Sequence, residues 1–131
     1  MAEATSVGRQ FFEAQDRLRG GPDPVLCAVD YTADVNGNHL DLEAHQAMAA
    51  AFYAGFPDLH HIVENVQTAE AAERVRVRAV GTHQQDFMGL PATGKPIDVS
   101  IDAIMMIEDG KVESLVIAFD QVGMLRQLGV Q

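Results

Sequence analysis

The feature that most constrains the fold is a series of strand-like segments in the second half of the chain. These segments are rich in β-branched and other apolar residues, are separated by turn signals, and span residues 59–69, 74–87, 97–107 and 111–119. Asp109-Gly110 separates the last two segments. This dipeptide favours a type I′ hairpin, because both central residues of that turn need positive φ. Consecutive strands joined by turns predict an antiparallel meander.

Helix-like segments dominate the first half of the chain. Apolar periodicity predicts helices over residues 5–19 and 41–54, a short helix over 24–27, a first strand over 31–36 and a closing helix over 121–128. Helices ahead of a run of strands indicate an α+β fold rather than a doubly wound α/β fold. Because 131 residues is the size of one domain, we expect a single domain over residues 1–131.

Local signals set the expected helix boundaries. Gly20 and Gly21 should end the first helix, since glycine reaches the left-handed geometry of helix ends at low cost. Asp23-Pro24 reads as an N-cap followed by proline at the first helical position. Asp41 is the expected cap of the long middle helix.

The charge of the chain excludes some partners. The net charge is −10 at pH 7, and such a surface repels phosphate backbones, so we expect no nucleic-acid or anionic-membrane partner. No stretch approaches the ~20 apolar residues that span a bilayer. Residues 1–15 lack the basic start and apolar run of a signal peptide, so we expect a cytoplasmic protein.

Two patterns that can mark a cofactor site are weak in this chain. Residues 89–95 match G-x-x-x-x-G-K, but Pro96 stands where Ser or Thr should hold magnesium, and a strand follows instead of a helix. His60 and His61 are adjacent on a strand and therefore point to opposite faces. The five histidines form no compact ligand cluster. From these residues we expect neither a bound metal nor a bound nucleotide.

Asp120, at the end of the last strand, is the main candidate for chemistry. Counted in steps of two, it shares a face with Val112, Ser114, Val116 and Ala118, small residues that would leave space above the sheet. The structural alternative is that Asp120 caps the helix that follows it. The residues alone leave both roles open.

His83 and Asp102 are the other candidates. His83 has the parity of Val75 and Val77, which places it on the apolar side of the sheet. It is either a hydrogen-bonded core residue or part of a pocket with a second ionisable group. Asp102 lies in an apolar strand and needs a partner, because burying a bare carboxylate is costly. It is either a second pocket acid or, as we favour, the ion-pair partner of an arginine on a neighbouring strand.

Four motifs occur together in this sequence: FPDL at 56–59, GTHQQDFMGLPATGK at 81–95, IEDGK at 107–111 and FDQVGMLRQLG at 119–129. In combination they resemble the SnoaL-like polyketide cyclases of the NTF2-like superfamily. The resemblance implies a cone, in which a strongly curved mixed β-sheet encloses a pocket and N-terminal helices pack on its concave face. It also implies a homodimer that pairs through the sheet.

The resemblance further implies cofactor-independent acid/base catalysis on an apolar small molecule. In this family an Asp at the position of Asp120 acts as general acid/base and drives an intramolecular aldol-type cyclisation, and His83 would assist it as a polar partner. The residues expected to bind substrate are Tyr31, Asn36, Phe52, Tyr53, Asp102 and Val116.

One departure from the family pattern affects the expected pocket. Relatives carry a His-Trp pair where this chain has Leu115 and Val116, and the chain contains no Trp, which implies a larger and simpler pocket. The alternatives are a non-catalytic binding protein for an apolar small molecule, or an isomerase or epoxide hydrolase of the same superfamily. An epoxide hydrolase needs an inward Asp-Arg-Asp set, whereas Arg74, Arg76 and Arg78 have outward parity.

Overall fold

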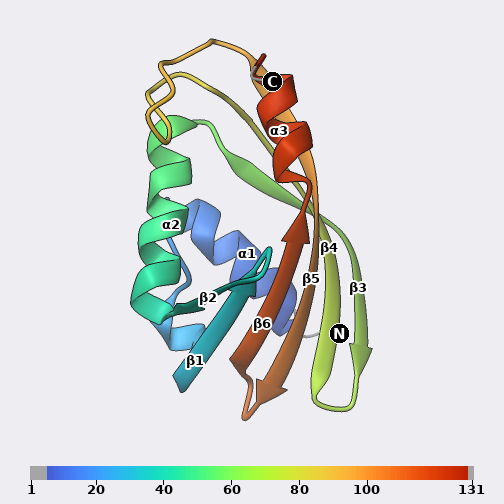
Figure 1. Ribbon diagram of the computed structural model, residues 1–131. Coiled ribbons are helices and arrows are strands. Elements are labelled where there is room, and N and C mark those ends of the chain that lie inside the picture. The colour runs from blue at the N-terminus through green and yellow to red at the C-terminus, as the bar shows by residue number, and fades with distance from the viewer. Residues whose placement is uncertain (1–5, 130–131) are drawn as a thin grey trace.

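Residues 6–129 are described by the structure, a computed structural model (Figure 1). The elements are α1 (Val7–Leu18), the 3-10 helix η1 (Pro24–Leu26), β1 (Cys27–Val35), β2 (Asn38–Asp41), α2 (Leu42–Gly55), β3 (His60–Ala69), β4 (Ala72–Thr82), β5 (Pro96–Glu108), β6 (Lys111–Phe119) and α3 (Gln121–Gln127). No helix within residues 6–129 is both long enough and apolar enough to cross a membrane.

The strands form one six-stranded mixed sheet in the order β2-β1-β6-β5-β4-β3. The strands from β3 to β6 form the expected antiparallel meander. β1 lies parallel to β6, and the short strand β2, which the sequence did not predict, pairs antiparallel with β1. Asp109 and Gly110 have φ of 53° and 74° in the β5–β6 turn, as a type I′ hairpin requires. The α+β class with a mixed sheet is therefore confirmed.

Side-chain caps begin the helices where the sequence predicted them. Asp23 accepts a hydrogen bond from a backbone N–H at the start of η1, and Asp41 does the same for α2. Ser6 caps α1, and the predicted start of this helix at Thr5 lies outside the described residues. The end of α1 differs from the prediction, because Arg19, not either glycine that follows, takes the left-handed conformation with φ 57°.

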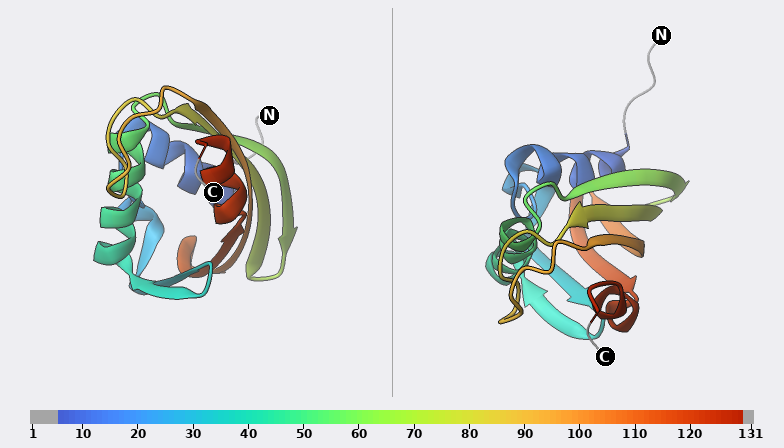
Figure 2. Two further views of the ribbon diagram at one scale, coloured as in Figure 1. Left: turned by 45° about the horizontal axis from the view of Figure 1, so that its top comes forward. Right: turned by 90° about the horizontal axis from the view of Figure 1, so that it is seen from above.

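The helices and the curved sheet surround a common interior (Figure 2). α1 packs against β3 and β4, α2 lies beside β1 and β2, and α3 packs on β5. The inward side chains form two apolar clusters. One lies between α1 and the middle of the sheet, and the other gathers the end of α2, the β4–β5 loop and α3.

A β-bulge in β6 changes which residues of this strand face inward. Met106 pairs with Ser114 and Ile107 with Val112, so Glu113 is an extra residue on β6. An extra residue shifts every later side chain to the opposite face. Counting in steps of two from Val112 to Asp120 was therefore wrong.

Candidate functional site

The interior contains a cavity lined by residues of all three α-helices, of the loop before β3 and of every strand except β2. The empty space within the cavity, counted out to the solvent at its opening, is about 650 Å³. The lining is aliphatic and aromatic apart from four polar residues, Gln15, His45, Tyr53 and His61. Such a cavity suits a largely apolar ligand fixed by a few polar contacts.

The carboxylate of Asp16, on α1, joins two of these polar residues. Its Oδ1 accepts a hydrogen bond from the Tyr53 hydroxyl at 2.6 Å and lies 2.7 Å from Nδ1 of His61. Its Oδ2 accepts the backbone N–H of His61 at 2.7 Å. α1, α2 and the start of β3 therefore meet at one half-buried acid.

The ionisation of this group follows from its contacts. Burial raises the pKa of Asp16, but the hydrogen bonds with His61 and Tyr53 outweigh burial and hold that pKa below its usual 3.8. Burial, followed by the hydrogen bond to Asp16, raises the pKa of Tyr53, so the phenol remains a donor. An ionised carboxylate only accepts hydrogen bonds, so Nδ1 of His61 carries the proton that it shares with Asp16.

A second imidazole borders the same cavity. His45, on α2, is 2% exposed, and its Nδ1 lies 2.8 Å from the Tyr31 hydroxyl. Its ring stacks on that of Tyr31 with centroids 6.1 Å apart. Burial lowers the pKa of His45 from 6.5 to about 4, so this imidazole is neutral at neutral pH.

The structure brings some of the expected substrate-binding residues to the cavity. Phe52 and Tyr53 line it, as predicted. Tyr31 is buried and does not line the cavity, but its hydroxyl contacts His45, which does. Asn36 lies in the exposed β1–β2 turn, outside the lining, and its Oδ1 accepts the backbone N–H of Phe119.

Val116 and Asp102 lie on the outer face of the sheet, contrary to the expected pocket role. The bulge turns Val116 outward, where it is 52% exposed. Asp102 accepts two hydrogen bonds from Arg74, at 3.1 and 2.9 Å, which hold the pKa of Asp102 below its ordinary value. The favoured interpretation of Asp102 as an ion-pair partner is therefore confirmed.

Asp120 flanks the cavity but does not line it. Its neighbours Phe119 and Met124 belong to the lining, while the Asp120 side chain is exposed. Its Oδ1 accepts the backbone N–H of Gly123 at 2.8 Å, which makes it the N-cap of α3. Asp120 therefore does have the structural role of a helix cap that the sequence offered as the alternative to catalysis.

His83 directly follows β4 and is buried inside the fold, the side that its parity predicted, but it lies outside the cavity lining. It is fully buried, stacks on Phe56 and accepts the backbone N–H of Thr93 at Nδ1. Its Nε2 is a buried polar atom without a hydrogen-bond partner among residues 6–129. The structure therefore does not bring His83 and Asp120 together across the cavity.

Sequence reasoning missed Asp16 and used His61 only to argue against a metal site. The sequence did contain a signal for His61, because of two adjacent histidines on a strand one must point to the inner face of the sheet. Asp16 gave no comparable signal, since a polar residue near the end of a helix is usually solvated. Across residues 6–129, no group of three or more His, Cys, Asp or Glu side chains is placed to hold a metal ion.

Comparison with known proteins identifies a matching family and several solved structures with a similar fold. Residues 24–128 match the family model described as SnoaL-like polyketide cyclase. The fold is similar to that of AclR from Streptomyces galilaeus, a candidate hydroxylase, with a TM-score of 0.84 and 21% identity over 94% of this chain and 92% of that chain. IdmH from Streptomyces antibioticus, a candidate polyketide cyclase, gives a TM-score of 0.76 and 27% identity over 92% of both chains.

A candidate SnoaL-like polyketide cyclase from Jannaschia sp. CCS1 covers the chain from end to end. It gives a TM-score of 0.75 and 21% identity over 100% of this chain and 99% of that chain. No curated protein matches this sequence significantly. The cone expected from the sequence motifs is the fold of these neighbours.

Proposed function

Because this chain belongs to the SnoaL-like polyketide cyclase family, we propose that it binds an apolar small molecule in its cavity and closes a ring within it. The observation that carries this proposal is the cavity itself, whose aliphatic and aromatic wall is interrupted by two imidazoles. An apolar wall holds a flexible substrate, and a few polar groups can move a proton on it.

The proposed reaction is an intramolecular aldol addition that needs no cofactor. A base removes a proton from a carbon beside a carbonyl, and the C–H electron pair becomes that of an enolate. The enolate carbon bonds to a second carbonyl carbon of the same molecule, and the resulting alkoxide takes the proton back. The cavity contributes by holding the substrate folded, so that its two reacting carbons meet. The entropy cost of bringing these carbons together is then met when the substrate binds.

The acid/base group of this reaction has three candidates. The family resemblance gives the role to Asp120, which is exposed and lies near the cavity-lining residues Phe119 and Met124. The geometry favours a group in the wall, because a base must lie within hydrogen-bond reach of the proton that it removes. The wall offers His61 and His45.

Filling the cavity tests the proposed function. Ala49 is buried on α2 and lines the cavity, whereas its neighbour Ala50 is exposed. We expect Ala49→Leu to weaken the binding of anilinonaphthalene sulfonate about tenfold, the equivalent of 1.4 kcal/mol of lost contact. We expect Ala50→Leu to bind this fluorescent probe like the unchanged protein.

The same pair of variants tests turnover. The substrate is a synthetic linear ester with ketones on alternate carbons. Ring closure is followed by NMR as the appearance of a cyclic isomer of this ester. Ala49→Leu should slow ring closure and Ala50→Leu should not. If the unchanged protein binds the fluorescent probe but does not close the ring, the proposed enzymatic activity is wrong. That result would favour a non-catalytic protein that binds an apolar small molecule.

A further inference from the structure

One carboxylate fixes the ring of His61 from two directions. Asp16 accepts the backbone N–H of His61 at Oδ2 and lies 2.7 Å from the ring nitrogen Nδ1 at Oδ1. Tyr53 donates to the same Oδ1 at 2.6 Å and holds the carboxylate in place. The His61 ring also packs on Phe12, with centroids 5.4 Å apart. The imidazole is therefore held before any ligand arrives.

The other ring nitrogen is the one left for chemistry. Among the described residues, Nε2 of His61 has no hydrogen-bond partner, and it is not one of the fully buried polar atoms. The residue lines the cavity, and its side chain is only 9% exposed. Because Nδ1 carries the proton shared with Asp16, the lone pair lies on Nε2 and is open to the cavity.

We propose that His61 is the general base of this cavity and that Asp16 is its positioning residue. The inference rests on the proposed function, in that it names the group that moves the proton in the ring closure. Nε2 takes the proton from the carbon beside the carbonyl, and the electron pair of that C–H bond forms the enolate. Asp16 stabilises the imidazolium that results. Nε2–H then returns the proton to the alkoxide of the closed ring.

The base is tested with a probe that needs no knowledge of the natural substrate. Nitrobenzisoxazole is a small aromatic molecule whose ring opens when a base removes its C–H proton. The C–H electron pair forms a nitrile, the N–O bond breaks, and the coloured phenolate is released. We expect His61→Gln to slow this reaction about a hundredfold, the usual contribution of a positioned base.

His60→Gln is the matched control. His60 is the neighbouring residue on β3 and is exposed, and its ring nitrogen Nδ1 lies 3.2 Å from the carbonyl oxygen of Asp58. We expect this variant to react at the rate of the unchanged protein. A His61→Gln variant that is folded by circular dichroism and retains the full rate would overturn the proposal.

Asp16→Asn separates positioning from a purely structural role. We expect it to lower kcat with little change in KM and to move the rising limb of the rate–pH profile to lower pH, because the carboxylate no longer stabilises the imidazolium. The titratable and charged groups around His61 are Asp16 on α1, Arg19 directly after α1, and Tyr53 and His45 on α2, while its partner on β4 is Ala79. An unshifted profile with unchanged kcat would assign Asp16 to structure alone.

A second measurement uses the unchanged protein and needs no turnover. Imidazole nitrogen NMR of the full chain at neutral pH should report the Nδ1–H tautomer of His61. The Nε2–H tautomer would overturn the proposal, because it leaves no lone pair towards the cavity.

The two experiments fail independently. If the ketone ester is not cyclised but nitrobenzisoxazole opening depends on His61, the proposed function is wrong and the assignment of His61 as a general base is kept. If the ester is cyclised equally well by His61→Gln, the function stands and the base fails.

Discussion

Two imidazoles border the cavity, and their partners give them different chemistry. His61 lies against the carboxylate of Asp16, which can stabilise a positive charge on the ring. His45 lies against the phenol of Tyr31, whose pKa is itself raised by burial. A buried ring without a counter-charge is costly to protonate. His45 is therefore suited to neutral hydrogen bonding, and His61 to proton transfer.

The burial of His45 predicts a pH-dependent loss of stability. Its pKa is lowered from 6.5 to about 4 in the folded state, so the unfolded chain binds a proton in this interval that the folded protein does not. Stability therefore falls as pH falls from 6.5 to 4, by about 3 kcal/mol at 1.36 kcal/mol per pH unit.

Urea unfolding at a series of pH values measures this loss. We expect His45→Gln to remove most of the slope between pH 6.5 and 4, since glutamine does not titrate. A variant that keeps the slope of the unchanged protein would assign the pH dependence to other groups.

At the scale of the elements, local signals predicted most boundaries. The caps Asp23 and Asp41, the Asp109-Gly110 turn and the alternation along β4 each depend on residues adjacent in sequence, and each is present in the fold. The bulge at Glu113 depends instead on how β6 meets β5. Local periodicity contains no information about an inserted residue, so the face of every later side chain was misassigned.

The candidate site was less predictable than the fold for a related reason. Asp16, Tyr53 and His61 come from three elements and meet only after the sheet curves. Their sequence separations are 37 and 45 residues from Asp16, and no periodic pattern links positions so far apart. Phe52 and Tyr53 were identified because the resemblance placed the middle helix against the pocket, not because their spacing indicated a ligand.

The cap of α3 makes a prediction about Asp120 that separates its two roles. We expect Asp120→Asn to retain stability, because asparagine also caps well, and Asp120→Ala to lose about 1 kcal/mol. If His61 is the base, Asp120→Asn should also retain the rate of nitrobenzisoxazole opening and of ring closure. Thermal unfolding and the two rate assays check these expectations. Abolished turnover in a stable Asp120→Asn variant would return the catalytic role to Asp120.

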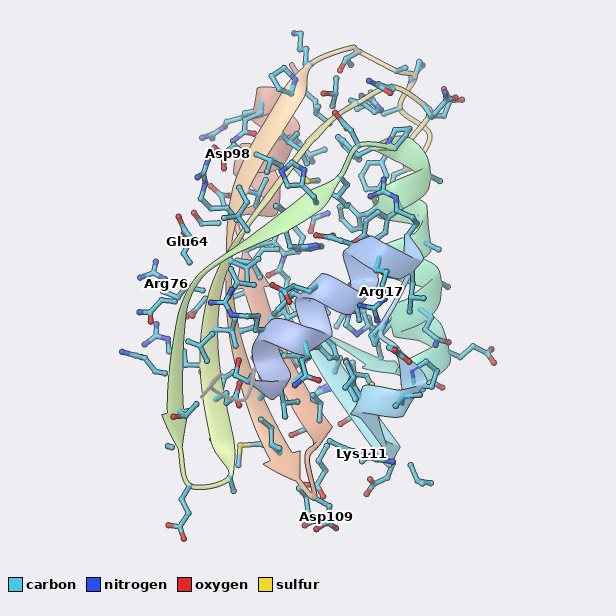
Figure 3. All side chains as sticks on the ribbon, turned by 180° about the vertical axis from the view of Figure 1, so that it is seen from behind. Arg17, Glu64, Arg76, Asp98, Asp109 and Lys111 are labelled. Carbon is cyan, nitrogen blue, oxygen red and sulfur yellow. The ribbon has the colours of Figure 1, made fainter. Side chains whose placement is uncertain are left out.

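At the scale of the whole molecule, the outer face of the sheet is the surface that the helices leave uncovered. Figure 3 shows Glu64 and Arg76 projecting from this face, away from the helices. Apolar side chains lie among the charges, with Ile104 beside Val116 across the β5–β6 pair. A surface that carries both charge signs around an apolar strip can complement a second copy of itself across a two-fold axis.

We therefore expect the chain to form a homodimer through this face, and Ile104→Glu to disrupt it. Ile104 is 46% exposed in the single chain, and a carboxylate buried without a partner at its position would cost several kcal/mol of association energy. Light scattering after size exclusion should give twice the chain mass for the unchanged protein and the single-chain mass for the variant.

Val29→Glu is the control, because Val29 is exposed on β1, outside the β5–β6 strip. An unchanged protein that elutes as a monomer at every concentration would contradict pairing, and a dimer that survives Ile104→Glu would move the interface elsewhere.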